Sequence, residues 1–389
     1  MPTTRSSTDP QKESEMPIEI VGGMISPFEG GEGGALTTAG GGSRRPFDTG
    51  YITRFVRAHE AAGFDTGLVG YGATGYDGFA IASHALHVTE KFGVLIAHRP
   101  GFAQPTLVAR KLATLDNLTG GGRVAMHFIT GGDEADQHRD GDFVPHDARY
   151  RRTAEYMEVI RRTLTADEPF DHEGEFYKFE GAYSVVKPAT EAGIPLYFGG
   201  ASGPALEAGA KNADTYMLWG EPLAPIAERI AQIREVSAKY GRSPRFSISL
   251  RPILGQTEDE AWARAQEIGD RTEERVQGRD FSDPGVRRNE SSVGAARLRA
   301  FAAEGDVLDE RLWMRVARLT GAGGNSTALV GTAEQVADAL LAYIQLGIST
   351  VLIRGFDPLG DAIDYGRELI PRLREATKDF EPHKELALP

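Results

Sequence analysis

The small and hydroxyl-bearing residues at positions 199–203 have the composition of an anion-binding turn. The segment reads Gly199-Gly-Ala-Ser-Gly203 and lies between an apolar run and a predicted helix. Backbone amides and a hydroxyl at a helix start bind anions, and the helix dipole adds about 0.3–1 kcal/mol for a negative group. A phosphate held by Gly200, Ala201 and Ser202 is one interpretation. A simple turn, with Ser202 as the helix N-cap, explains the same residues equally well.

Two further positions have side chains that suit ligand binding. His146 and Tyr150 lie four residues apart, on one face of a predicted helix start, and would suit a phosphate or a hydroxyl-rich ligand. A histidine N-cap above a buried tyrosine is the alternative. His127 alternates with Met126 and Phe128 on a predicted strand and therefore faces the opposite side. A core histidine with satisfied hydrogen bonds is the simpler interpretation of this residue.

An acidic segment separates that strand from the helix of His146. Residues 133–146 include seven Asp, Glu or His residues. Their spacing matches no compact set of metal ligands, so a solvated acidic loop is favoured and no metal site is predicted. No Ser-His-Asp arrangement stands out either.

The elements that would position these side chains follow a repeating pattern. Strand-like apolar runs begin near residues 18, 66, 92, 124, 195, 214, 246 and 350, and each is followed by a helical pattern. Eight such units predict an α/β fold of the (β/α)8 TIM-barrel type, whose site lies at the carboxyl ends of the strands. An open doubly wound sheet would normally carry a Gly-x-Gly-x-x-Gly turn after its first strand, and none is present there.

The predicted barrel spans residues 17–377, between a disordered tail at 1–16 and a C-terminal tail at 378–389. Two insertions are expected. One covers about 166–192 and contains a hairpin over Phe170–Phe179. The other covers about 269–326, is charged and irregular, and would act as a mobile lid region. The segment Gly30–Gly42 holds seven glycines in 13 positions, so we expect a mobile loop or one ordered by a ligand.

Composition limits the class of protein. The 389 residues carry a net charge of −13, which argues against nucleic-acid or anionic-membrane partners. The chain has no cysteine, which excludes disulfides and thiolate chemistry. No apolar run approaches the roughly 20 residues that span a bilayer, and the N-terminus lacks the apolar core of a signal peptide. A cytoplasmic protein is expected.

Several motifs together resemble the bacterial-luciferase-like flavin monooxygenases, and the most similar branch is the FMNH2-dependent alkanesulfonate monooxygenases. The similarity runs from Ile18 to about Leu373 with the motifs in the same order. They are Ile129-Thr-Gly-Gly, Asp140-Gly-Asp-Phe, His146-Asp-Ala-Arg-Tyr150, Pro195-Leu-Tyr-Phe-Gly-Gly-Ala-Ser202, Leu218-Trp-Gly-Glu-Pro222 and Thr327-Ala-Leu-Val-Gly331.

The resemblance implies a barrel with a lid, reduced FMN (FMNH2) supplied by a separate NAD(P)H-dependent flavin reductase, and O2 as co-substrate. It implies oxygen insertion into a small organic molecule, with organosulfur compounds as one candidate class, by a homodimer or homotetramer. Ser202 with the amides of Gly200 and Ala201 would hold the FMN phosphate, and His146 and Tyr150 would contact the phosphate and ribityl chain. Thr130 would also contact the cofactor. His127 and Trp219 would lie near the flavin ring and substrate as catalytic residues.

The sequence departs from the alkanesulfonate pattern at five positions. The branch usually has Asn at the position of His127 and Cys near Gly75. Its Arg-x-His pair on the seventh strand reads Ser249-Leu-Arg251 here. The lid arginine of the branch aligns near Thr320, and the tyrosine of its last strand near Phe356.

These changes affect the expected substrate pocket. Ser249 and Arg251 point the same way on a strand, so Arg251 could place one cation in the pocket and act in catalysis. Arg99, Arg318 or Arg354 would supply another. The predicted substrate-binding residues are therefore Ser249, Arg251, Thr320, Arg354 and Phe356. We expect the flavin monooxygenase chemistry with a substrate other than a simple alkanesulfonate. The alternatives are an F420-dependent oxidoreductase of the same superfamily and a non-catalytic flavin-binding relative.

Overall fold

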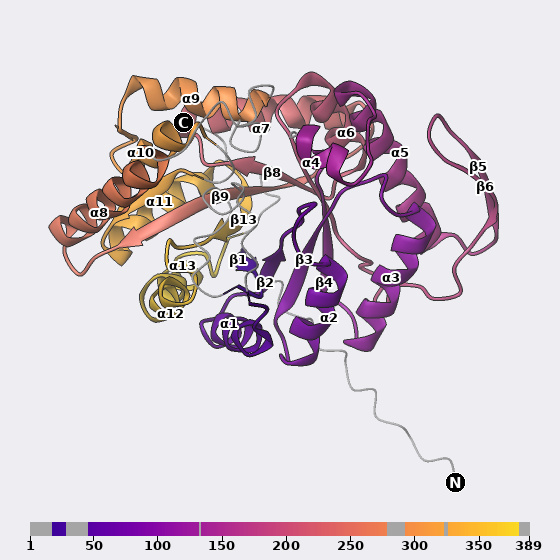
Figure 1. The fold of residues 1–389 in the computed structure, drawn as a ribbon, viewed down its shortest axis with the longest axis horizontal. Helices are drawn as coiled ribbons and strands as arrows, with labels where there is room; N and C mark the ends of the chain where they lie inside the picture. Colours follow the sequence, from indigo (N-terminus) through magenta and orange to yellow (C-terminus); the bar gives the residue numbers. More distant parts are fainter. Residues whose placement is uncertain (1–17, 29–45, 132–133, 278–291, 323–325, 381–389) are drawn as a thin grey trace, which may run out of the picture.

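A closed barrel of eight parallel strands forms the centre of the molecule (Figure 1). The computed structural model describes residues 18–28, 46–131, 134–277, 292–322 and 326–380. The ring runs β13-β1-β2-β3-β4-β7-β8-β9 and closes because β9 also pairs with β13. The predicted (β/α)8 barrel is confirmed, with each strand near its predicted position. The strands are β1 Glu19–Ile25, β2 Thr66–Val69, β3 Gly93–His98, β4 Val124–Phe128, β7 Leu196–Gly199, β8 Thr215–Trp219, β9 Arg245–Leu254 and β13 Ile348–Ile353.

Helices surround the barrel and cover the outward-facing apolar side chains of its strands (Figure 1). Met126 and Phe128 of β4, for example, are fully buried in this outer core. The last predicted helix is divided into three pieces by a π-helical turn at Tyr365–Leu369. The helices are α1 Thr49–Ala61, α2 Gly78–His87, α3 Pro105–Leu118, α5 His146–Thr165, α6 Gly203–Asn212, α7 Leu223–Ala238, α8 Glu258–Gln277, α11 Ala333–Gln345, α12 Gly360–Asp364 and α13 Ile370–Ala376.

Side-chain caps determine where several helices begin after the strands. Asp77 accepts a hydrogen bond from the amide of Ala80 (2.8 Å) and so ends the loop between β2 and α2. At α8 the amide of Glu260 donates to the Thr257 hydroxyl (3.2 Å), and the amide of Thr257 donates to the Glu260 carboxylate (3.3 Å). These two hydrogen bonds form a capping box. Caps of this kind stabilise a helix by about 1 kcal/mol each.

The inside of the barrel has its own apolar layer, which includes Ala125, Tyr197 and Leu352. At the amino end of the strands, the Tyr197 hydroxyl donates to the Glu19 carboxylate (2.5 Å), and the Thr350 hydroxyl donates to the same carboxylate (3.0 Å). This polar layer fills the amino end of the barrel. A ligand site is therefore expected at the other end, where the strands lead into loops.

The predicted hairpin is confirmed and projects from the barrel beside α5 (Figure 1). Its strands, β5 Phe170–Glu173 and β6 Lys178–Ala182, pair antiparallel. Glu155 of α5 holds the turn of this hairpin by accepting hydrogen bonds from the amides of Phe176 and Tyr177, both 2.9 Å.

The second half of β9 leaves the barrel and supports a separate layer. Here β9 pairs in parallel with β12 Ala328–Gly331, and two short strands, β10 Val307–Leu308 and β11 Leu312–Trp313, continue the sheet. The same region contains the helices α9 Val293–Glu304 and α10 Arg315–Thr320, and α8 continues to Gln277. A small apolar cluster holds this layer together: Ile253, Ala261, Ala265, Ile268, Trp313, Val316, Ala328, Val330 and Phe356.

Three strands and one short helix were not predicted from the sequence. These are β10, β11, β12 and the helix α4, Glu134–Arg139, inside the acidic segment. The predicted tail at 1–16, the glycine-rich stretch 30–42 and residues 381–389 lie outside the described residues. Within the described ranges, no helix has the length and apolar character needed to cross a membrane.

Candidate active site

His127 faces the inside of the barrel near the carboxyl end of β4. Ala125, two residues earlier on the same strand, belongs to the inner apolar layer, so His127 points the same way. Its ring is half-buried, and its Nδ1 atom is buried without a hydrogen-bond partner among the described residues. Burial lowers the pKa of His127 to about 4, so the imidazole is neutral at pH 7. The Nδ1 atom lacks the hydrogen bond expected of a satisfied core histidine.

A glycine on the neighbouring strand lies next to this imidazole. A Cβ placed on Gly199 of β7 would lie 3.1 Å from the carbonyl oxygen of Met217 and 3.7 Å from Nε2 of His127. A larger side chain at position 199 would therefore crowd Met217 and contact the imidazole, so glycine lets β7 and β8 approach closely beside His127.

The turn from β7 into α6 is held from behind by two side chains. The Tyr216 hydroxyl donates to the carbonyl oxygen of Gly200 (2.7 Å), and Arg229 donates to the carbonyl oxygens of Ala201 (3.2 Å) and Gly200 (3.4 Å). A Cβ on Gly200 would lie 2.5 Å from the Cβ of Ala205, so the turn requires glycine there. Arg229 was not among the predicted site residues, because nothing in its helical pattern distinguishes it from a surface arginine.

The start of α5 meets the same turn. Ser202 is the N-cap of α6, accepts a hydrogen bond from the amide of Ala205 (3.3 Å), and interacts with the Tyr150 hydroxyl. The rings of His146 and Tyr150 are in edge contact, with centroids 5.1 Å apart. Burial is the main reason that the pKa of Tyr150 is raised, so its hydroxyl stays protonated. His146, Tyr150 and Ser202, predicted from separate motifs, thus lie next to one another.

Thr130 ties the end of β4 to α5. Its side chain is buried, and its hydroxyl forms a 3.1 Å hydrogen bond with the hydroxyl of Thr153 on α5. Thr153 also donates to the carbonyl oxygen of Arg149 (2.9 Å). Thr130 therefore fixes the position of the helix that carries His146 and Tyr150.

Trp219 ends β8 and is covered by α9. A Cβ on Gly294 of α9 would lie 3.0 Å from Cζ3 of Trp219, so this close approach depends on the glycine. The next turn of α9 is held by an ion pair in which Arg297 donates to the buried carboxylate of Glu221 (2.5 and 2.9 Å). The second insertion therefore reaches the barrel mouth at Trp219.

Four of the five predicted substrate residues lie within β9 or just after β13. Ser249, Arg251, Arg354 and Phe356 are all buried, and the Arg251 guanidinium lies 4.6 Å from the centre of the Phe356 ring. Thr320 differs from them. Its side chain is fully buried within α10, where the hydroxyl donates to the carbonyl oxygen of Val316 (2.6 Å).

Two of the three arginines considered as a second cation are engaged elsewhere. Arg99 donates to Asp136 (3.0 Å) and to Asp140 of the acidic segment. Its guanidinium lies between the rings of Tyr71 and Phe102, 4.4 and 4.5 Å from their centres. Arg318 forms an exposed ion pair with Asp306 (2.8 Å). Arg354 is the candidate that the fold places beside Arg251, because β13 pairs with β9.

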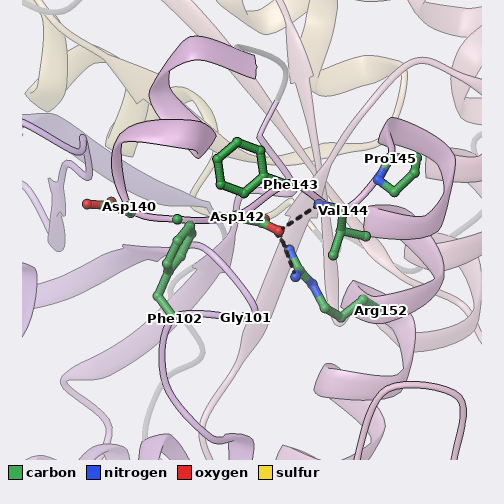
Figure 2. Close-up of a pocket in the computed structure, with 9 residues that line it drawn as sticks. Gly101, Phe102, Asp140, Asp142, Phe143, Val144, Pro145 and Arg152 are labelled. Carbon is green, nitrogen blue, oxygen red and sulfur yellow. Dashed lines mark hydrogen bonds and ion pairs between the residues drawn. The ribbon is translucent and has the colours of Figure 1, made fainter.

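The acidic segment is largely ordered by arginines. Figure 2 shows Asp142 paired with Arg152 (2.5 Å) in the wall of a pocket of about 490 Å³. None of the predicted site residues lines this pocket. Among the described residues, no group of three or more His, Asp or Glu side chains is arranged to hold a metal ion. The roles of Arg99 and Arg152 were not predicted, because ion pairs between distant residues leave no local pattern. The lining residues are Gly101, Phe102, Asp140, Gly141, Asp142, Phe143, Val144, Pro145 and Arg152.

Comparison with known proteins shows the family to which this chain is similar. Residues 23–350 match the model of the luciferase-like monooxygenases. Three solved structures share the fold. DmoA from Hyphomicrobium sulfonivorans is 22% identical, with 92% of this chain and 88% of that chain covered and a TM-score of 0.71. The long-chain alkane monooxygenase LadA is 18% identical, with coverages of 92% and 91% and a TM-score of 0.70. An F420-dependent secondary alcohol dehydrogenase is 16% identical, with coverages of 92% and 99% and a TM-score of 0.64.

The family match covers most of the chain, including the strands that carry His127, the Gly200–Ser202 turn and Trp219. The solved structures support the same closed barrel over nearly the full length of each chain. The chain therefore belongs to the luciferase-like monooxygenase family, a family of flavin-dependent enzymes.

Proposed function

We infer that this protein is the monooxygenase component of a two-component system and uses FMNH2 and O2 to oxidise a small organic molecule. A separate NAD(P)H-dependent flavin reductase would supply the FMNH2. Organosulfur compounds are one candidate substrate class, because the sequence resembles the alkanesulfonate branch while changing its sulfonate-associated positions. The observation that carries the proposal is the meeting of Ser202, Tyr150 and His146 at the start of α6.

The turn at Gly200–Ser202 has the chemistry needed for a flavin phosphate. It opens a helix, whose positive dipole end attracts an anion. Two hydroxyls and an imidazole are close by, and Arg229 adds a cation behind the turn. Ser202, Tyr150 and His146 would hold the phosphate and the adjoining ribityl chain.

His127 would contact the flavin ring or the reacting oxygen. Its unsatisfied Nδ1 atom is the feature expected where a ligand completes the hydrogen bonding. Because the pKa of His127 is about 4, the ring would work as a neutral hydrogen-bonding group at pH 7. Bound FMNH2 would supply the two electrons that activate O2.

Trp219 and the helix α9 would exclude water from the reaction. Trp219 would form one wall of the site, and α9 lies against it. Closing an active site in this way strengthens polar interactions and protects reactive groups from hydrolysis. The second insertion, to which α9 belongs, would act as the predicted lid over the site.

Anaerobic titration with FMNH2 and with reduced riboflavin tests the cofactor site. Reduced riboflavin has the same ring without the phosphate. We expect Ser202→Ala and Tyr150→Phe to weaken FMNH2 binding about tenfold each, which is the effect of losing one hydrogen bond to a charged group. Riboflavin binding should change little. Thr332→Ala, which removes the N-cap of α11, serves as the matched control. Unchanged FMNH2 affinity in both Ser202→Ala and Tyr150→Phe would show that the phosphate lies elsewhere.

Two alternatives remain to be tested. An F420-dependent oxidoreductase would be favoured if the purified protein carried F420 and no FMN. A non-catalytic relative would be favoured if stoichiometric FMNH2 and O2, with a panel of sulfonates and thioethers, produced only hydrogen peroxide at the rate of free FMNH2. An oxidised product from any member of the panel would support the monooxygenase.

A further inference from the structure

Two methionines in the strands of the barrel keep part of their surface accessible to solvent. They are Met24 of β1 and Met217 of β8, and both residues are half-buried. The other methionines that the structure describes, Met126, Met157 and Met314, are fully buried. Methionine packs as a flexible apolar side chain, but its thioether can also be oxidised when an oxidant reaches it. The position of the two partly accessible methionines is therefore of chemical interest.

Three observations place the Met24 side chain inside the barrel. The register pairs Met24 with Leu68 of β2, which packs against the inner apolar layer. Ile25, the next residue of β1, belongs to the outer core, and successive side chains of a strand point to opposite faces. A Cβ placed on Gly70, the residue after β2, would lie 2.5 Å from Sδ of Met24. The thioether therefore lies over Gly70 at the mouth of the barrel, where β1 and β2 end.

Met217 lies on a different wall of the barrel, near His127. It packs against the inner apolar layer. A Cβ placed on Gly199 of β7 would lie 3.4 Å from the Cβ of Met217 and 3.7 Å from Nε2 of His127. Met217 is thus close to the imidazole that would contact the flavin ring or the reacting oxygen. The strands β9 and β13 separate β8 from β1 in the ring, so the two methionines border the interior from different sides.

A thioether in this position can react with hydrogen peroxide. When no substrate takes up the oxygen, FMNH2 reduces O2 to hydrogen peroxide and is itself oxidised to FMN. The sulfur lone pair of methionine attacks one oxygen of the peroxide, the O–O bond breaks, and a sulfur–oxygen bond forms. The thioether is thereby oxidised to the sulfoxide. The other peroxide oxygen is reduced and leaves as water, with the proton of the transferred oxygen.

We propose that Met24 and Met217 form an oxidation site that traps hydrogen peroxide produced in the barrel mouth. This inference rests on the proposed function, because FMNH2 and O2 are the source of the peroxide. Oxidation changes a flexible apolar side chain into a polar one, so it would make the inner wall more polar at β1 and β8. Methionine sulfoxide reductases reverse this reaction, so the site could be used repeatedly.

Peptide mass spectrometry of the full chain, treated with hydrogen peroxide in the absence of flavin, tests whether the two thioethers are accessible. We expect Met24 and Met217 to form sulfoxide at least about tenfold faster than the buried methionines, because a fully buried thioether reacts only after local opening. The buried references are Met126, Met157 and Met314. Equal rates at all of these positions would overturn the proposal.

Oxidation of FMNH2 by O2 in the presence of catalase tests whether the peroxide is trapped where it forms. Catalase destroys peroxide in the bulk solution, so sulfoxide formed under these conditions arises from peroxide that has not left the barrel. We expect sulfoxide at Met24, at Met217 or at both, and none at the buried methionines. The same amount of peroxide added from outside, with catalase, should oxidise none of them. Protection of both Met24 and Met217 by catalase would contradict trapping at the site.

Peroxide release from variants gives a second measurement. Leucine preserves most of the volume of methionine. In the absence of catalase, the double variant Met24→Leu/Met217→Leu should release more peroxide per FMNH2 oxidised than the wild-type protein in the first turnovers. Met126→Leu, in the outer core, is the matched control and should release the wild-type amount. Equal release from the double variant and the wild type would mean that the thioethers trap no peroxide.

An anaerobic FMNH2 titration of the wild-type protein separates this inference from the proposed function. Saturable FMNH2 binding, without sulfoxide at Met24 or Met217 in the presence of catalase, would refute the oxidation site and leave the cofactor assignment intact. Absence of both FMNH2 binding and sulfoxide would contradict the two proposals together.

Discussion

At the scale of single residues, His127 combines an inward orientation with an unsatisfied Nδ1 atom. A neutral imidazole can donate at one nitrogen and accept at the other. The local pattern predicted which way His127 faces. It could not predict the missing partner, because that depends on β7, which is about 70 residues away in the sequence.

His127→Ala should reduce the rate of product formation about tenfold or more, because a hydrogen bond at the reacting centre is lost. His127→Asn should retain more activity, since an amide can also donate and accept. Because the folded pKa is about 4, the wild-type rate should show no inflection from His127 between pH 6 and 8. An inflection near pH 6.5 that disappears in His127→Asn would contradict this assignment.

Gly101 gives a second test at this scale. Its φ angle is +109°, and an added Cβ would lie 2.6 Å from the Arg152 guanidinium. The backbone conformation alone would cost an alanine about 1 kcal/mol. Because of the added contact with Arg152, Gly101→Ala should lower the free energy of unfolding by more than this amount. Gly120→Ala is the control, because Gly120 has φ +78° and no atom within 4 Å of an added Cβ. If urea denaturation shows that Gly101→Ala and Gly120→Ala lower the free energy of unfolding equally, the contact with Arg152 has no effect on stability.

At the scale of elements, the loop between β4 and α5 depends on buried ion pairs. Arg152 holds Asp142, and both side chains are nearly inaccessible to solvent. Arg152→Met would leave a buried carboxylate without its partner and should lower the free energy of unfolding by about 3 kcal/mol. Arg151→Met removes an exposed arginine of the same helix that pairs with Glu175, and should have little effect. Similar losses in the two variants, measured by urea denaturation, would contradict a structural role for Asp142.

The ion pair between Glu221 and Arg297 holds α9 against Trp219. Arg297→Gln should therefore increase the rate of amide hydrogen exchange in α9 and change the fluorescence of Trp219. Arg151→Gln breaks an exposed ion pair between α5 and Glu175, far from α9 in the sequence, and should change neither signal. Unchanged exchange in α9 would mean that its apolar contacts alone hold it in place.

Element boundaries also show what the sequence can predict. The eight barrel strands were recognisable because each is an apolar run followed by an amphipathic helix. The strand β12 is also a short apolar run before a helix, α11, but it pairs with a part of β9 that lies outside the barrel, which no local pattern indicates. The helix α4 is polar and six residues long, and Arg99 holds it through Asp136 and Asp140. Such contacts between distant segments are invisible to a local pattern.

At the scale of the whole molecule, buried histidines make the fold sensitive to acid. Burial lowers the pKa of His59 to about 4, of His98 to about 3 and of His127 to about 4, from 6.5. Below pH 6.5 the unfolded chain takes up protons that the folded chain refuses, so stability falls as the pH falls toward 4. Each histidine contributes a slope of up to about 1.4 kcal/mol per pH unit.

The free energy of unfolding should therefore be lower at pH 5.5 than at pH 7.5 when measured by urea denaturation. His98→Gln should reduce this difference by about one third, and substitution of the exposed His87 by Gln should leave it unchanged. Equal stability of the wild-type protein at the two pH values would contradict the burial effect.

The proposed function requires that this barrel binds FMNH2. Anaerobic titration of the wild-type protein with FMNH2 and, in parallel, with reduced F420 tests it most directly, with binding followed by calorimetry. We predict saturation at one FMNH2 per chain, with a dissociation constant at least about tenfold lower than that for reduced F420. Tighter binding of reduced F420, or no saturable binding of FMNH2, would contradict the assignment of FMNH2 as the cofactor.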